Sequence, residues 1–79
     1  MLETFAYSIK VKNSNLRTLY YLLSKRKSIY QVSIDGNDDE FSYVYIESKM
    51  DINEMKNWLY RLHQNGGVKY FGVTQVNFK

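Results

Sequence analysis

Seventy-nine residues, of which 44% are hydrophobic and 16% aromatic, are enough for one small domain with its own core, and this composition argues against a disordered chain. The net charge is +3, and the absence of cysteine excludes both a disulfide framework and a thiolate metal site. We therefore expect a single domain over residues 1–79, in a reducing compartment.

The first predicted element is a strand over residues 4–12, "TFAYSIKVK", because hydrophobic side chains recur at every second position. Its predicted buried face carries Phe5, Tyr7, Ile9 and Val11. Either Asn13 or Ser14 is expected to cap the helix that follows, since both side chains accept bonds from free backbone N–H groups. The buried face of this helix, at i, i+3, i+4 and i+7 spacing, is predicted to consist of Leu16, Leu19, Tyr20 and Leu23. The helix ends in "KRK" at residues 25–27, where cations suit the negative end of the helix dipole.

A hairpin is predicted next. The segment "SIYQVSI", residues 28–34, alternates in the same way and is expected to bury Tyr30, Val32 and Ile34. The segment "DGNDDE", residues 35–40, is a predicted polar turn in which Gly36 or Asn37 supplies a positive φ. The strand "FSYVYIES", residues 41–48, completes the hairpin.

A second helix is predicted to begin after Asp51. In "DINE", Asp51 and Glu54 form a capping box in which each side chain satisfies a free N–H group of the first turn. Met50 and Met55 flank this box and are placed for a hydrophobic staple. The predicted buried stripe of the helix consists of Met55, Trp58, Leu59 and Leu62.

The sequence "NGG" at residues 65–67 is expected to end this helix, and residues 68–78 form a predicted last strand with a bulge at Gly72. The order of elements is therefore βαββαβ. Right-handed crossovers place both helices on one side of a four-stranded antiparallel sheet, with the first and third strands in the centre. This is the α+β ferredoxin-like sandwich. Because two layers share one core, we expect the other face of the sheet to be open.

The strand at residues 41–48 decides what lies on that open face. Val44 and Ile46 are expected to lie beneath the helices, because the opposite arrangement exposes both to water. The open face then carries the rings of Phe41, Tyr43 and Tyr45. The neighbouring positions of the first strand are Ala6, Ser8 and Lys10, whose small or flexible side chains are expected to leave the rings uncovered. An aromatic patch of this kind on a small domain indicates a binding surface.

The same strand resembles the RNP1 motif of the RNA-recognition motif, a family with this fold whose pattern is K/R-G-F/Y-G/A-F-V-x-F/Y. In "FSYVYI", Phe41 and Tyr43 match the two stacking aromatics, and Ser42 matches the small residue between them. The resemblance implies that these rings stack on bases of single-stranded RNA. The motif opens with a basic residue and a glycine, whereas this chain has Asp39 and Glu40, which repel a phosphate.

Charge is divided along the chain. Acidic residues cluster between residues 35 and 54, and the remainder is basic. A basic surface attracts phosphates through counterion release, and divided charge also suits docking on a protein of complementary potential. The residues that we expect to bind RNA or a protein partner are Phe41, Tyr43, Tyr45, Lys10, Lys12, Arg17, Lys25, Arg26 and Lys27.

We expect no enzymatic activity, no cofactor and no metal, since His63 is the sole histidine and the first strand is not followed by a glycine-rich phosphate loop. The predicted function is that of a small regulator that binds a macromolecule, with single-stranded RNA as the most specific candidate ligand. Two alternatives stay open. One is a viral-type inhibitor or adaptor that blocks a host protein, and the other is a homodimer whose open faces pack together.

The first residues, "MLETFAYSIKVK", alternate and do not form the apolar run of a signal peptide. No apolar stretch approaches the roughly 18 residues of a membrane span. We therefore expect a cytoplasmic protein without a membrane partner. Asn, Lys, Tyr and Ile, which have AT-rich codons, are abundant and favour a virus or an AT-rich bacterium as the source.

Overall fold

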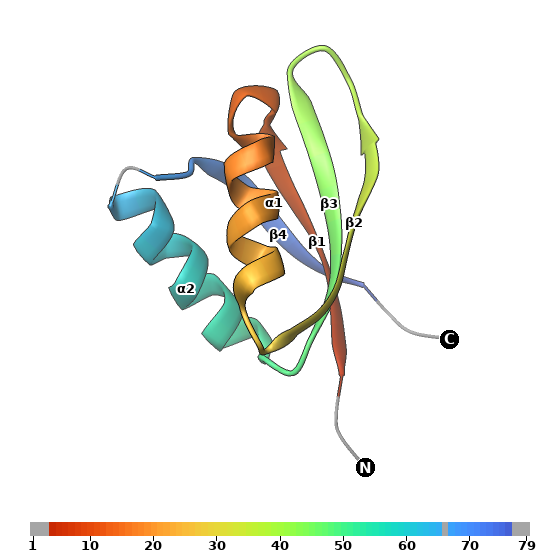
Figure 1. Cartoon of the computed structure of the whole chain (residues 1–79), viewed down its shortest axis with the longest axis vertical. Helices are drawn as coiled ribbons and strands as arrows, with labels where there is room; N and C mark the ends of the chain where they lie inside the picture. Colours follow the sequence, from red (N-terminus) through yellow and green to blue (C-terminus); the bar gives the residue numbers. More distant parts are fainter. Residues whose placement is uncertain (1–3, 66, 77–79) are drawn as a thin grey trace.

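The computed structural model describes residues 4–65 and 67–76, which form a four-stranded sheet with two helices on one face (Figure 1). The strands are β1 (Phe5–Lys12), β2 (Ile29–Asn37), β3 (Phe41–Ser48) and β4 (Tyr70–Val76). The 3-10 turn η1 (Asn13–Asn15) leads into helix α1 (Leu16–Lys25), and helix α2 (Ile52–Gln64) connects β3 to β4. The strand order is β2-β3-β1-β4, and neighbouring strands are antiparallel. The predicted ferredoxin-like fold, with the first and third strands in the centre, is confirmed.

The alternation along β3 separates the two faces of the sheet. Val44 and Ile46 are fully buried on the helix side. Phe41, Tyr43 and Tyr45 lie on the opposite face and are half-buried. Because successive side chains of a strand point to opposite faces, burying the two aliphatic residues directs the three rings away from the helices. The predicted orientation of β3 is confirmed.

The core fills the space between the sheet and the two helices. β1 contributes Tyr7, Ile9 and Val11, each fully buried. The helices add Leu19 and Leu23 from α1 and Met55, Trp58 and Leu59 from α2. Burial of side chains of this size contributes roughly 1.5–3 kcal/mol each, which gives a small domain its stability.

Helix α2 begins with the predicted capping box. The Asp51 carboxylate accepts a hydrogen bond from the backbone N–H of Glu54 at 2.9 Å, and the Glu54 carboxylate accepts one from the N–H of Asp51 at 3.1 Å. Met50 and Met55 on either side are both buried in the core. The helix ends at Gln64, and Gly66 of the predicted "NGG" stop lies outside the described residues.

The predicted cap of α1 by Asn13 or Ser14 is wrong. Both residues belong to η1, and the start of α1 has no side-chain cap. The Asn13 side chain instead joins the end of β1 to the β2–β3 hairpin. It donates a hydrogen bond to the carbonyl oxygen of Asp38 at 2.9 Å and accepts one from the Ser42 hydroxyl. The Asn13 carboxamide, which could have capped the helix, thus makes tertiary hydrogen bonds instead.

The predicted inward positions of Tyr20 and Tyr30 are wrong, because these side chains are 40% and 45% exposed. The pairing of β2 with β3 shifts register between Ile29 and Gln31, which removes Tyr30 from the alternation. Ile29 packs against the core instead. Tyr20 lies at the margin of the buried face of α1, where that helix meets β2.

The β2–β3 hairpin is longer than predicted and projects past the helices (Figure 1). β2 continues to Asn37, and neither Gly36 nor Asn37 has the predicted positive φ. A second register shift, between Ile34 and Gly36, accommodates the extra residue. Ile34 keeps its place opposite Val44 on the helix side, but it is 51% exposed because no helix covers this part of β2 fully.

The last strand contains the predicted bulge. The pairing of β1 with β4 shifts register beside Gly72, whose φ of +153° lies in the region that favours glycine. The structure describes this strand as far as Val76. Residues 77 and 78 of the predicted strand lie outside the described residues.

A buried hydrogen bond from Tyr7 provides a test of the core. The Tyr7 hydroxyl donates to the carbonyl oxygen of Met50 at 2.7 Å, and Tyr7→Phe leaves that buried acceptor unpaired. We expect the free energy of unfolding in urea to fall by about 1–3 kcal/mol. The control is Tyr45→Phe, which removes a phenol from the open face, where water can replace it, and is expected to cost less. Equal losses in the two variants would contradict the assigned burial.

Candidate binding site on the open sheet face

The pairing register brings small side chains beside the rings of β3. Lys10 of β1 lies opposite Tyr43 on one side and Gly72 of β4 on the other. Ser8, two residues earlier on the same face, lies opposite Tyr45. Ser8 and Gly72 therefore form a low strip along the open face, interrupted by the flexible Lys10 side chain, and the aromatic side chains of β3 stand beside it.

β4 supplies a fourth ring, Phe71, which the sequence-based prediction missed. Phe71 is the extra residue of the bulge at Gly72 and stands on the open face, 50% exposed. Its neighbour Tyr70 packs against the core, and the centroids of the Tyr70 ring and the His63 ring of α2 are 6.0 Å apart. The signal for this ring was the glycine-marked bulge itself, because a bulge places an additional residue opposite one position of the partner strand.

Two rings of the open face are in contact with each other. The centroids of Phe41 and Phe71 are 5.1 Å apart in an edge-to-face arrangement, and the Lys10 ammonium lies 4.3 Å from the Phe41 centroid. These contacts cover part of Phe41, and Tyr43 and Tyr45 are half-buried as well, so the expectation that the rings are uncovered is corrected. Phe71 is the ring with the most open access.

A shallow hollow of about 360 Å³ lies on this face, and we call it the aromatic hollow. It is lined by Ser8, Lys10, Tyr43, Phe71, Gly72 and Thr74. The rings of Tyr43 and Phe71 can stack on a planar group, the hydroxyls of Ser8 and Thr74 can hydrogen-bond to its edge, and the Lys10 ammonium can hold a negative charge. The space beside Gly72 is open, since a Cβ built there would meet no atom within 4 Å.

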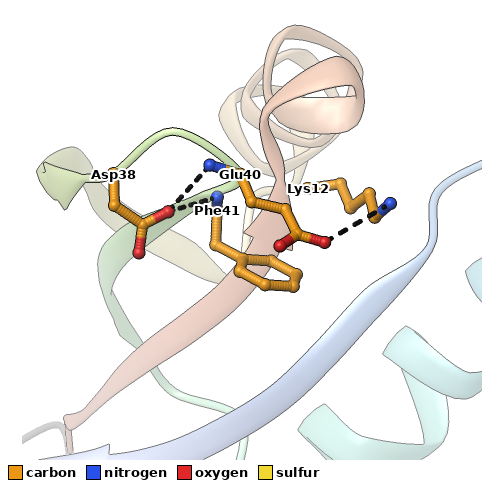
Figure 2. Close-up of polar contacts among 4 residues, drawn as sticks. All are labelled: Lys12, Asp38, Glu40 and Phe41. Atoms are coloured by element: carbon orange, nitrogen blue, oxygen red, sulfur yellow. Dashed lines mark hydrogen bonds and ion pairs between the residues drawn. The ribbon is translucent and has the colours of Figure 1, made fainter.

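The hairpin end beside the hollow is held by Asp38 (Figure 2). Its carboxylate accepts hydrogen bonds from the backbone N–H groups of Phe41 at 2.7 Å and Glu40 at 2.9 Å. These two bonds lower the pKa of Asp38 below 3.8, its ordinary value. The Glu40 carboxylate turns back to the Lys12 ammonium at 3.7 Å. Of the acids ahead of β3, Asp38 thus positions Phe41, and Glu40 forms an ion pair with Lys12.

Tyr45, at the far end of the row, is engaged in a different way. Its hydroxyl donates to the Glu47 carboxylate at 2.9 Å, and this hydrogen bond is the main reason that the pKa of Tyr45 is raised. The phenol therefore stays neutral at physiological pH. Tyr45 lies outside the lining of the aromatic hollow.

The predicted site residues are divided between the two sides of the sheet. Those on the open face are Phe41, Tyr43, Tyr45, Lys10 and Lys12. Those on α1, or in the segment that follows it, are Arg17, Lys25, Arg26 and Lys27. The guanidinium of Arg26 is partly buried, 4.9 Å from the ring of Trp58, and has a structural role. The structure thus brings together the aromatic residues and two of the six predicted cations.

The helix side of the sheet carries a second candidate surface, a groove of about 870 Å³ between α1 and β2 that we call the edge groove. Its apolar lining comes from Leu16, Tyr20, Tyr21, Val32 and Ile34. Arg17 lines the same groove, and the Lys25 ammonium lies 4.9 Å from the Tyr21 ring. β2 is an edge strand of the described sheet, so the groove runs beside backbone groups that no strand within residues 4–65 and 67–76 pairs.

Within residues 4–65 and 67–76, no group of three or more His, Cys, Asp or Glu side chains is placed to hold a metal ion. No helix in the described part of the chain is long and apolar enough to cross a membrane.

The comparisons with known proteins support the fold. The chain is similar to the solution structure of the ACT domain from the GTP pyrophosphokinase of Chlorobium tepidum, with a TM-score of 0.60 and 16% sequence identity. The match covers 98% of this chain and 89% of that one. No family model and no curated protein matches the chain. The resemblance to the RNA-recognition motif is therefore limited to the order of elements in the fold and to the sequence of the third strand.

The role of Asp38 in holding the hairpin can be tested through pH. Because the folded-state pKa is lowered, its contribution to stability is fully present above pH 3.8 and is lost as the pH falls through the lowered pKa. We expect urea unfolding to show a smaller acid-induced loss of stability for Asp38→Asn than for the wild type. The asparagine keeps an accepting oxygen but does not titrate. Identical pH profiles would show that the ionised Asp38 carboxylate does not stabilise the hairpin.

Proposed function

We propose that this chain is a non-enzymatic binding module that takes up single-stranded RNA on the open face of its sheet. The observation that carries the proposal is the aromatic hollow, in which Tyr43 of β3 and Phe71 of β4 line one space with the Lys10 ammonium. Aromatic rings beside cations are the usual means by which proteins bind unpaired bases and their phosphates.

The proposal differs from the RNP1-based expectation in its choice of rings. That resemblance pairs Phe41 with Tyr43, but Phe41 is covered in part by Phe71 and by the Lys10 ammonium. Phe71, 50% exposed, is the more accessible surface for a base. We therefore assign the stacking role to Tyr43 and Phe71 and a supporting role to Phe41.

The proposed function predicts how ring deletions affect RNA affinity. Tyr43→Ala and Phe71→Ala should each weaken binding of a short single-stranded RNA by about 1–3 kcal/mol, the usual value of one stacked base. Fluorescence titration at two salt concentrations measures this effect, and the affinity should fall with salt. Tyr60→Ala is the matched control, because Tyr60 is 57% exposed on α2, away from the open face. Equal affinity for all four proteins, wild type included, would rule out stacking on this face.

The edge groove favours a second candidate function, association with a second copy through β2. Two β2 strands pairing antiparallel about a two-fold axis would bring the apolar groove linings together. The same axis would place the acidic hairpin end of one copy, residues 35–40, beside the basic segment 25–27 of the other, because these segments lie at opposite ends of β2. Such a dimer leaves the open face accessible, so it is compatible with RNA binding.

Sedimentation equilibrium tests this association. The mass should rise from one chain to two with concentration, and salt should weaken the dimer, because its complementary charges are exposed. Ile34→Lys, in the groove, should give a monomer, whereas Val76→Lys, on the opposite edge strand β4, should not. A monomer at all concentrations, or equal effects of the two lysines, would exclude a dimer through β2.

A further inference from the structure

We infer that a second hollow, beside the first, is a phosphate subsite for the bound RNA. This hollow of about 430 Å³ is lined by Lys12, Ser14, Asn15, Gly67, Lys69 and Phe71, and we call it the lysine hollow. The inference rests on the proposed function, since it assigns a place to the backbone of the strand whose bases stack on the open face.

The lysine hollow is built from segments far apart in the sequence. Lys12 is the last residue of β1, Ser14 and Asn15 belong to η1, and Lys69 comes just before β4. A hydrogen bond from the backbone N–H of Lys69 to the Asn15 side-chain oxygen, at 3.1 Å, joins the two sides. The fold therefore fixes the two lysines around one space.

The chemistry of the lining suits a phosphate. The two ammonium groups supply positive charge, and the Ser14 hydroxyl can donate a hydrogen bond. The Asn15 side-chain oxygen accepts the hydrogen bond from Lys69, and the NH2 group of the same carboxamide can serve as a donor to a ligand. Charge-assisted bonds of this kind are shorter and stronger than those between neutral groups.

An acid already competes for this charge. The Glu40 carboxylate lies 3.7 Å from the Lys12 ammonium, and the two side chains are 62% and 46% exposed (Figure 2). An exposed pair of this kind contributes little to stability, so a phosphate can displace Glu40 at small cost. The acid thus lowers the affinity of the subsite without blocking it.

Phe71 connects the lysine hollow to the aromatic hollow, because it lines both. A base stacked on Phe71 would have its sugar-phosphate at the boundary between the two spaces. The arrangement assigns neighbouring subsites to neighbouring parts of one strand, with the base on β3 and β4 and the phosphate at the β1–η1 junction.

Removal of one lysine tests the subsite. We measure binding of a five-nucleotide RNA at about 50 and 200 mM salt to Lys69→Gln and to the control Lys56→Gln, which removes the same charge from an exposed position on α2. Lys69→Gln should reduce the salt slope by about 0.7, the value for one contact with a single strand, and weaken binding roughly 3- to 10-fold. Lys56→Gln should leave both nearly unchanged. Glu40→Gln should tighten binding, because it removes the competing carboxylate.

The outcomes separate this inference from the proposed function. If Phe71→Ala weakens binding while Lys69→Gln behaves like Lys56→Gln, RNA binds the open face but the lysine hollow is not its phosphate subsite. If no variant and no wild-type protein binds the RNA, both proposals are wrong. A second measurement uses RNAs with one uncharged methylphosphonate linkage at each position in turn. At one position, the uncharged linkage should weaken binding to the wild type but leave binding to Lys69→Gln unchanged. If no position behaves in this way, the inference is overturned.

Discussion

The burial of Val44 and Ile46 beneath the helices is the constraint on which the rest of this structure depends. β3 lies in the middle of the sheet, paired with β1 and β2, so its alternation determines which face receives the core. A slip of one residue would place Tyr43 under the helices and both aliphatic side chains in water. The aromatic row on the open face is therefore a consequence of how the core is packed, and it is fixed as firmly as the core itself.

That constraint alone would give a row of rings, and two local features add the hollows beside this row. Ser8 on β1 and Gly72 on β4 keep a strip of small residues on either side of Lys10, which pairs with Tyr43. The bulge at Gly72 then places Phe71 on the far side of this strip, where it lines both hollows. The edge groove lies on the helix side of the sheet, away from the aromatic hollow and the lysine hollow, so binding in the groove leaves both hollows accessible.

The order of elements, the strand order and the orientation of β3 could be predicted from the sequence, because each depends on hydrophobic periodicity or on the handedness of crossovers. The capping box of α2 could be predicted because it is local. The predicted cap of α1 failed because Asn13 is used by the distant hairpin. The predicted burial of Tyr30 was wrong because no glycine or proline in the sequence marks the register shift between Ile29 and Gln31.

The candidate site was predictable only in part, for the same reason. Phe41 and Tyr43 follow from the strand pattern. Gly72 marks the bulge that carries Phe71, but the position of Phe71 beside the other rings depends on the pairing of β1 with β4. The lysine hollow is still less predictable, since Lys12 and Lys69 meet only through the fold. Among the predicted cations, Arg26 belongs instead to the packing of Trp58.

The measurement that tests the central claim most directly is a map of backbone amide chemical shifts during titration with a short single-stranded RNA. The account predicts that the perturbed amides belong to β1, β3 and β4, with the largest shifts around Tyr43 and Phe71. Shifts confined to α1 and α2, or none at RNA concentrations that saturate ordinary single-strand binders, would contradict it.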